Sequence, residues 1–204
     1  MSTVSRPSGA LSEVDARARH LATRLVAIAE TLGLVLRSDQ SRTDLPTIRA
    51  AFAELARVGV GRHSAELPTR VSAATMSAAA DHLLESVEGS PLPDLEWTPI
   101  SEVLGDELLA RLVGISASSL HRYRASERAT PDSVAERLHQ ITLVVSDLSG
   151  SYNDLGIRRW FARPRTALGG RAPAEIFAGK WSPDDGSVRE ARHLARALLG
   201  AGIA

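Results

Sequence analysis

The stretch "LVGISASSLHRYRASERATPDS", residues 112–133, decides how the middle of this chain is expected to fold. A short apolar segment runs into Gly114, and a polar segment with three arginines follows it. Glycine tolerates the positive φ that a tight turn between two helices requires. The stretch therefore predicts two short helices joined at Gly114. It leaves open whether this pair binds DNA or only packs against other helices.

The apolar spacing across residues 106–125 favours a helix-turn-helix. This motif joins two helices by a short turn that often contains glycine. A small residue is needed where the second helix crosses the first, and Ala110 stands there, four residues before Gly114. The second helix is expected over residues 117–125. The apolar residues expected to hold the pair together are Leu109, Val113, Ile115, Leu120 and Tyr123.

The opposite face of the 117–125 helix carries polar side chains that suit nucleic acid. Ser118, His121 and Arg122 follow the spacing i, i+3 and i+4, which places them on one helix face. A hydroxyl, an imidazole and a guanidinium suit base edges in a major groove, and further arginines suit phosphates. The full set of candidate DNA-binding residues is Ser116, Ser118, Ser119, His121, Arg122, Arg124 and Arg128.

The charge distribution argues against a general nucleic-acid-coating protein. The chain holds 24 basic and 24 acidic residues and is neutral overall. Residues 96–150 hold 5 basic and 8 acidic residues, whereas residues 151–204 hold 9 and 5. A monomer with few phosphate contacts binds DNA weakly. Any DNA binding is therefore expected to need a homodimer or a higher oligomer.

Composition predicts an all-α protein. Hydrophobic residues make up 44% of the chain but aromatic residues only 4%, and the alanine and leucine that dominate favour helices. There is no cysteine, and the six histidines are scattered, so we expect no metal site and no cofactor. We find no catalytic constellation and expect no enzyme. No apolar run is long enough to span a membrane, and we expect a cytoplasmic protein.

Three domains are expected. Residues 1–95 form a helical N-terminal extension of unknown role, with helices at 11–36, 44–58 and 71–87. The proline-rich stretch "EGSPLPDLEWTP", residues 88–99, indicates a boundary, after which helices resume at Ile100. Residues 96–150 hold the helix-turn-helix. Residues 151–204 form a small helical unit with a tryptophan core, in which Pro173 begins a short helix.

Two stretches resemble a known family. "GISASSLHRYRASERATP" resembles the Xre (lambda-repressor-like) group of DNA-binding domains. "RRWFARPRTALGGRAPAEIF" resembles the toxin-binding domain of the Xre/MbcA/ParS antitoxins, in which a tryptophan helix, a proline and "aLgG" precede a proline-led helix. The two domains in which these stretches lie, residues 96–150 and 151–204, together cover roughly half the chain, in the family's domain order. The long N-terminal extension departs from many members.

The resemblance implies a type II antitoxin. Such a protein would block a NAD-consuming toxin, either of the RES type or related to ADP-ribosyltransferases, and would bind operator DNA to regulate itself. The toxin-contacting surface would include the final helix and tail, residues 194–204. The residues expected to bind the toxin are Trp160, Arg163, Pro164, Leu168, Gly169, Gly170, Pro173 and Leu198. The alternatives are a stand-alone transcription regulator whose C-terminal domain binds another protein, and a structural adaptor.

Overall fold

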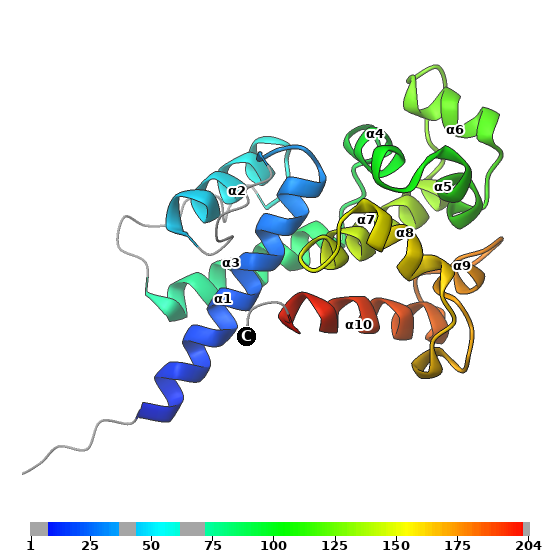
Figure 1. The fold of residues 1–204 in the computed structure, drawn as a ribbon. Coiled ribbons are helices and arrows are strands. Elements are labelled where there is room, and N and C mark those ends of the chain that lie inside the picture. Colours follow the sequence, from blue (N-terminus) through cyan, green and yellow to red (C-terminus); the bar gives the residue numbers. More distant parts are fainter. Residues whose placement is uncertain (1–7, 37–43, 62–71, 202–204) are drawn as a thin grey trace, which may run out of the picture.

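The computed structural model of the chain describes residues 8–36, 44–61 and 72–201. Within these residues the chain is helical and contains no strand, which confirms the expected all-α class (Figure 1). None of the described helices combines the length and the apolar character that crossing a membrane requires. The elements are α1 (Ser8–Thr31), α2 (Leu45–Arg57), α3 (Ala73–Glu88), α4 (Pro93–Leu104), α5 (Asp106–Val113), α6 (Ala117–Arg124), α7 (Asp132–Ser149), α8 (Asp154–Ala162), the short 3-10 helix η2 (Thr166–Leu168), α9 (Pro173–Ile176) and α10 (Gly186–Ala201).

Helices α1, α2 and α3 pack around one apolar core at one end of the molecule, opposite α5 and α6 (Figure 1). Their inward residues follow the expected helical spacing, and Leu25 and Phe52 are fully buried. α1 ends at Thr31 rather than at Leu36, because Gly33 adopts a φ of 69° and turns the chain. Leu36 beyond the turn is 91% exposed.

The proline-rich segment 88–99 is more helical than expected. α4 begins at Pro93 rather than at Ile100. Proline is tolerated in the first turn of a helix, where its missing N–H has no helical partner. Pro99 lies inside α4, and the same helix buries the side chains of Trp97 and Ile100. Burial of these two side chains explains how tertiary packing overrides the local signal for a break.

Helix α7 links two hydrophobic cores. Residues 138–148 are buried without interruption, because α7 packs against α1, α4, α5, α8 and α10. Ile141 and Val144 belong to the core that α4 to α10 share. Leu143, on another side of the same helix, belongs to the α1–α3 core. A helix that is buried on all sides in this way is the typical centre of a helical domain, although α7 also buries polar side chains such as His139 and Asp147.

The helices on the two sides of residue 150 share one core. Its members run from Trp97 in α4 to Ala195 in α10. Much of the C-terminal contribution is aromatic, since Phe177 packs edge-on against Phe161 at 6.1 Å and against Trp181 at 5.1 Å between ring centroids. The helix-turn-helix segment and the C-terminal segment therefore bury each other's apolar side chains.

A buried cluster of charges joins α1, α3, α7 and α10. Arg24 donates from Nε to Asp147 Oδ1 at 3.0 Å and from Nη1 to Glu88 Oε1 at 2.5 Å. The side chains of Arg24 and Asp147 are only 5% and 3% exposed. From α10, Arg196 donates to Glu88 at 2.9 Å and Arg192 lies 3.6 Å from the same carboxylate. The N-terminal helices are thereby ion-paired to the last helix.

Candidate functional site

The turn between α5 and α6 has the backbone geometry that the sequence predicts. Gly114 adopts φ 74° and ψ 40°, the left-handed region that favours glycine. The N–H of Ile115 donates to the carbonyl oxygen of Ala110 at 3.0 Å and closes the end of α5. Ser116 then caps α6, because its hydroxyl accepts the N–H of Ser119 at 3.2 Å.

The apolar residues expected to hold this pair together lie inside the core. Leu109, Val113 and Leu120 are completely buried. Tyr123 stacks on Trp97 of α4, with ring centroids 5.9 Å apart. Ile115 is half-buried and packs against the same core. The orientation of α6 is consequently fixed by packing, and its other face is presented to solvent.

That outer face of α6 carries the side chains predicted to meet base edges. Ser118, His121 and Arg122 are all exposed. The side chain of Arg122 makes no hydrogen bond or ion pair with any residue that the structure describes. Its guanidinium is therefore available to bind a ligand, and its planar set of N–H donors matches a guanine edge or a phosphate.

Arg124 differs from Arg122 because it is already paired. It donates to both carboxylate oxygens of Asp106 in α5, at 2.6 and 3.0 Å, and its Nη2 lies 3.0 Å from His121 Nδ1. These hydrogen bonds hold the pKa of Asp106 below its ordinary value. A bidentate pair of this kind fixes the start of α5 to the end of α6. Contact of Arg124 with a phosphate stays a prediction, and it would compete with this pair.

The remaining candidates on this surface also have roles within the fold. Besides capping α6, the hydroxyl of Ser116 lies 3.1 Å from that of Ser118 and 3.0 Å from that of Ser119. The guanidinium of Arg128 lies over the Tyr123 ring, 5.8 Å from its centroid. These contacts hold the α6 surface in one conformation, and the DNA-binding role of these residues stays a prediction.

The residues predicted to bind a toxin divide into buried and exposed groups. Trp160, Leu168 and Pro173 are buried in the core. Leu198 is half-buried against that core. The exposed members, which a partner could contact directly, are Arg163, Pro164, Gly169 and Gly170. The two glycines adopt φ values of 65° and 81°, so they form the turn that leads from η2 to α9.

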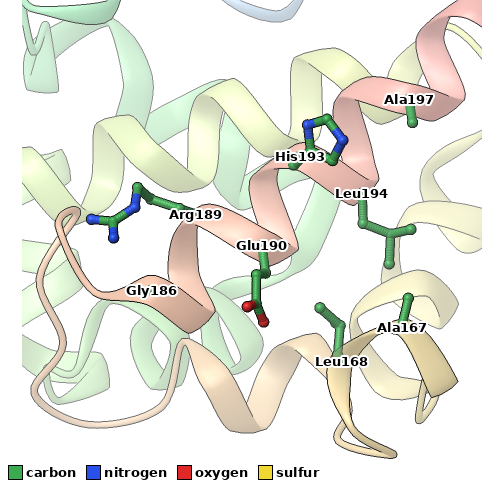
Figure 2. A pocket seen from close by; sticks show the side chains of 8 residues that line it. All are labelled: Ala167, Leu168, Gly186, Arg189, Glu190, His193, Leu194 and Ala197. Carbon is green, nitrogen blue, oxygen red and sulfur yellow. The ribbon is translucent and has the colours of Figure 1, made fainter.

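A groove of about 590 Å³ lies between η2 and α10. Figure 2 shows Glu190 and Leu194 of α10 directed toward Leu168, which lies across the groove on η2. Leu194 belongs to the final-helix surface that the sequence suggested, whereas residues 202–204 lie outside the described residues. The residues that line the groove are Ala167, Leu168, Gly186, Arg189, Glu190, His193, Leu194 and Ala197.

Sequence reasoning missed Arg189, Glu190 and His193 as groove residues. Their positions were detectable, because they recur with Leu194 and Ala197 at spacings of three and four along one face of a helix. It also missed a contact between the helix-turn-helix and the segment that leads into α10. Trp181, just before α10, donates its indole N–H to the carbonyl oxygen of Leu112 in α5 at 2.8 Å.

Comparisons of the chain with protein-family models, with curated proteins and with solved structures each gave no match. Within the described part of the chain, His, Asp and Glu side chains form no group of three that could hold a metal ion. The described residues thus present two candidate binding surfaces, the outer face of α6 and the groove between η2 and α10 (Figure 2).

Proposed function

We propose that this chain is a DNA-binding antitoxin of a type II toxin–antitoxin system. In this proposal the outer face of α6 binds operator DNA, and the groove between η2 and α10 binds and blocks a NAD-consuming toxin of the RES or ADP-ribosyltransferase type. The observation that carries the proposal is the left-handed turn at Gly114, which joins α5 to a short helix with an exposed, locally basic face.

The DNA-binding half of the proposal is supported by the local charge of α6. Between residues 121 and 128 the chain has three arginines and one histidine against one glutamate, although residues 96–150 are net acidic. An exposed, unpaired Arg122 on a helix whose inner face is fully packed is suited to direct readout in a major groove. A homodimer would double these contacts and match an operator with two half-sites.

The toxin-binding half is supported by the groove. Leu168 and Leu194 supply an apolar centre, while Arg189, Glu190 and His193 supply charged and polar groups around it. An apolar centre with a polar rim is the usual composition of a protein-binding surface. The exposed turn at Gly169 continues from η2 and can extend the contact.

DNA binding is tested by fluorescence anisotropy with a labelled fragment from upstream of the chain's own gene. We expect Arg122→Ala to weaken binding about tenfold or more, since one good base contact contributes about 1–3 kcal/mol. Arg19→Ala is the matched control, because Arg19 is an exposed arginine on α1, at the other end of the molecule (Figure 1). Equal affinity of both variants and the parent chain would refute the assignment of α6.

Toxin binding is tested by co-expressing the chain with the NAD-consuming protein encoded beside its gene and measuring growth and cellular NAD. Leu194→Glu places a charge in the groove and is expected to abolish protection. Leu36→Glu makes the same substitution at a side chain that is already 91% exposed and should protect like the parent chain. Full protection by the Leu194 variant would remove the groove from the proposal.

Point substitutions are preferable to removal of the C-terminal segment. Residues after 156 contribute Ile157, Trp160 and Phe161 to the core that also holds α5 and α6. A truncated chain would lose this shared core, so its failure to bind either partner would report unfolding rather than a lost surface.

A stand-alone transcription regulator is the second candidate. The observation that favours it is the charged cluster on α10, where Arg192 and Arg196 are ion-paired to Glu88 of α3. One face of α10 is thus occupied by ion pairs with α3 of the same chain. A chain that binds its promoter through Arg122 but protects against no neighbouring NAD-consuming protein would support this regulator over the antitoxin.

A further inference from the structure

A second pocket, of about 530 Å³, lies along α8 and is completed by the residues just before and after this helix. This pocket is distinct from the groove on α10, because no residue lines both of them. The residues that line it are Tyr152, Gly156, Arg159, Trp160, Arg163, Pro164 and Arg165. Three of these are arginines, and none is acidic.

The positive charge of this pocket is only partly balanced by the surrounding sequence. Residues 154–175 contain five arginines against two acidic residues, Asp154 and Glu175, and neither acidic residue lines the pocket. Arg158 is engaged elsewhere, since it donates to the backbone carbonyl of Val103 at 2.6 Å. Arg159, Arg163 and Arg165 form no ion pair with any residue that the structure describes. Three guanidinium groups around one cavity repel one another unless an anion lies between them.

Buried donors beside the pocket also lack acceptors. Trp160 is only 1% exposed, and its indole N–H has no hydrogen-bond partner among the described residues. The Nε of Arg165 is likewise buried and unpartnered. Arg165 lies over the Trp160 ring, 5.0 Å from its centroid. Burial lowers the pKa of Arg165, the neighbouring Tyr152 opposes this shift, and the charge of Arg163 adds to it. A bound anion would supply the missing acceptors.

One residue of the pocket offers an apolar face. Tyr152 is 37% exposed and packs against Gly156, where an added Cβ would lie 3.0 Å from two atoms of the tyrosine side chain. The absence of a side chain at Gly156 thus lets the tyrosine lie close to α8. An exposed aromatic ring beside three arginines suits a ligand that has both an aromatic ring and a phosphate.

We propose that this pocket binds a small phosphorylated molecule of nucleotide size, with its phosphate held by Arg159, Arg163 and Arg165. A phosphate is favoured over a single carboxylate because it carries more charge and offers at least three acceptor oxygens to three guanidiniums. The volume is also much larger than one small ion requires and lies in the usual range of ligand pockets. The proposal goes beyond the antitoxin function, because it requires neither toxin nor DNA.

The test is isothermal titration calorimetry of the full chain with ADP, pyrophosphate and adenosine. ADP and pyrophosphate should bind, and adenosine should bind at least tenfold more weakly, since it has no phosphate. Arg163→Gln should weaken ADP binding tenfold or more. Arg171→Gln is the matched control, because it removes the same charge from an exposed arginine of the same segment that does not line the pocket. Its affinity should stay within twofold of the parent chain.

Two results would overturn the proposal. One is the absence of measurable heat with both phosphate compounds, and the other is an equal loss in the Arg163 and Arg171 variants, which would indicate only diffuse charge attraction. Arg159→Gln provides a second variant at an exposed position, and unchanged melting temperatures verify that the variants are folded. Because only the purified chain is used, a negative result leaves the antitoxin proposal untouched.

Discussion

The turn at Gly114 and the loop at Gly179 pack backbone against backbone. A Cβ added to Gly114 would lie 2.3 Å from the carbonyl oxygen of Gly179, closer than real Cβ atoms approach. The obstacle is backbone, so no flexible side chain can move aside. The helix-turn-helix turn is consequently held in place by the segment that leads into α10, and glycine is required there for a tertiary reason as well as a local one.

Gly114→Ala is expected to destabilise the chain more than Gly169→Ala. Both glycines adopt the left-handed conformation, with φ values of 74° and 65°, but nothing lies within 4 Å of a Cβ at Gly169. Each variant loses about 1 kcal/mol from backbone strain, and only the Gly114 variant adds a collision. Urea unfolding followed by tryptophan fluorescence measures the difference. Equal losses of unfolding free energy in the two variants would show that the loop at Gly179 moves aside without an energetic cost.

The indole of Trp181 provides a second test of this contact. Trp181→Phe keeps an aromatic ring but removes the hydrogen bond to the carbonyl oxygen of Leu112, and it should cost about 1 kcal/mol. Trp181→Ala also removes the ring that packs against Phe177 and should cost about 3–5 kcal/mol. The measurement is the free energy of unfolding in urea. If the two variants lost the same amount, the ring packing would contribute nothing.

The helix pair is predictable from sequence because its determinants are local. Ala110, Gly114 and the apolar residues of α5 and α6 lie within one short segment, and their spacing alone indicates which face is inside. The contact of Trp181 with Leu112 is not predictable in this way, because the two residues are 69 positions apart. Local spacing also places Arg124 in the second helix without revealing that Asp106 neutralises it.

The candidate site illustrates the same limit. The exposure of Ser118, His121 and Arg122 follows from helical periodicity and is confirmed. The groove, in contrast, requires knowing that η2 lies beside α10, which only the tertiary packing determines. The start of α4 was predicted wrongly for a different reason. The prolines of this segment indicate a break in the helix, but burial of Trp97 outweighs that local preference and α4 begins at Pro93.

The ion pair between Asp106 and Arg124 gives an expected pH dependence. Hydrogen bonds from Arg124 lower the pKa of Asp106. The stabilisation is therefore fully present above the pKa of the unfolded chain, about 3.9, and is lost as the pH falls through the lower folded value. Arg124→Gln should raise the pKa of Asp106 toward the ordinary value, as measured by NMR titration of the carboxyl carbon.

Arg122→Gln is the control for this titration. It removes the same charge from the same helix, but Arg122 makes no hydrogen bond to Asp106. The pKa of Asp106 should therefore change less than in the Arg124 variant. A shift of equal size in both variants would mean that general helix charge, rather than the bidentate pair, lowers the pKa of this carboxyl group.

The buried pair between Arg24 and Asp147 is expected to matter far more than an exposed pair on the same helix. Arg24→Met removes the hydrogen-bonded partner of the buried Asp147 carboxylate and leaves it only the more distant Arg196, 4.0 Å away, and breaking such a buried pair costs about 3–5 kcal/mol. Arg17→Met removes the partner of Asp81, where both side chains are at least 43% exposed, and should cost less than about 1 kcal/mol. Chemical unfolding at pH 7 compares the two variants.

The loss in the Arg24 variant should also depend on pH and on Asp147. Burial raises the pKa of Glu88, but Arg24, Arg196 and Arg192 together lower it below its ordinary value. Its stabilisation is therefore present above the unfolded pKa and declines as the pH falls, so the cost of Arg24→Met should shrink in acid. Asp147→Asn, added to Arg24→Met, removes the buried negative charge that Arg24 no longer pairs and should restore part of the lost stability. A double variant no more stable than Arg24→Met alone would show that lost packing of the arginine, rather than the unpaired carboxylate, causes the destabilisation.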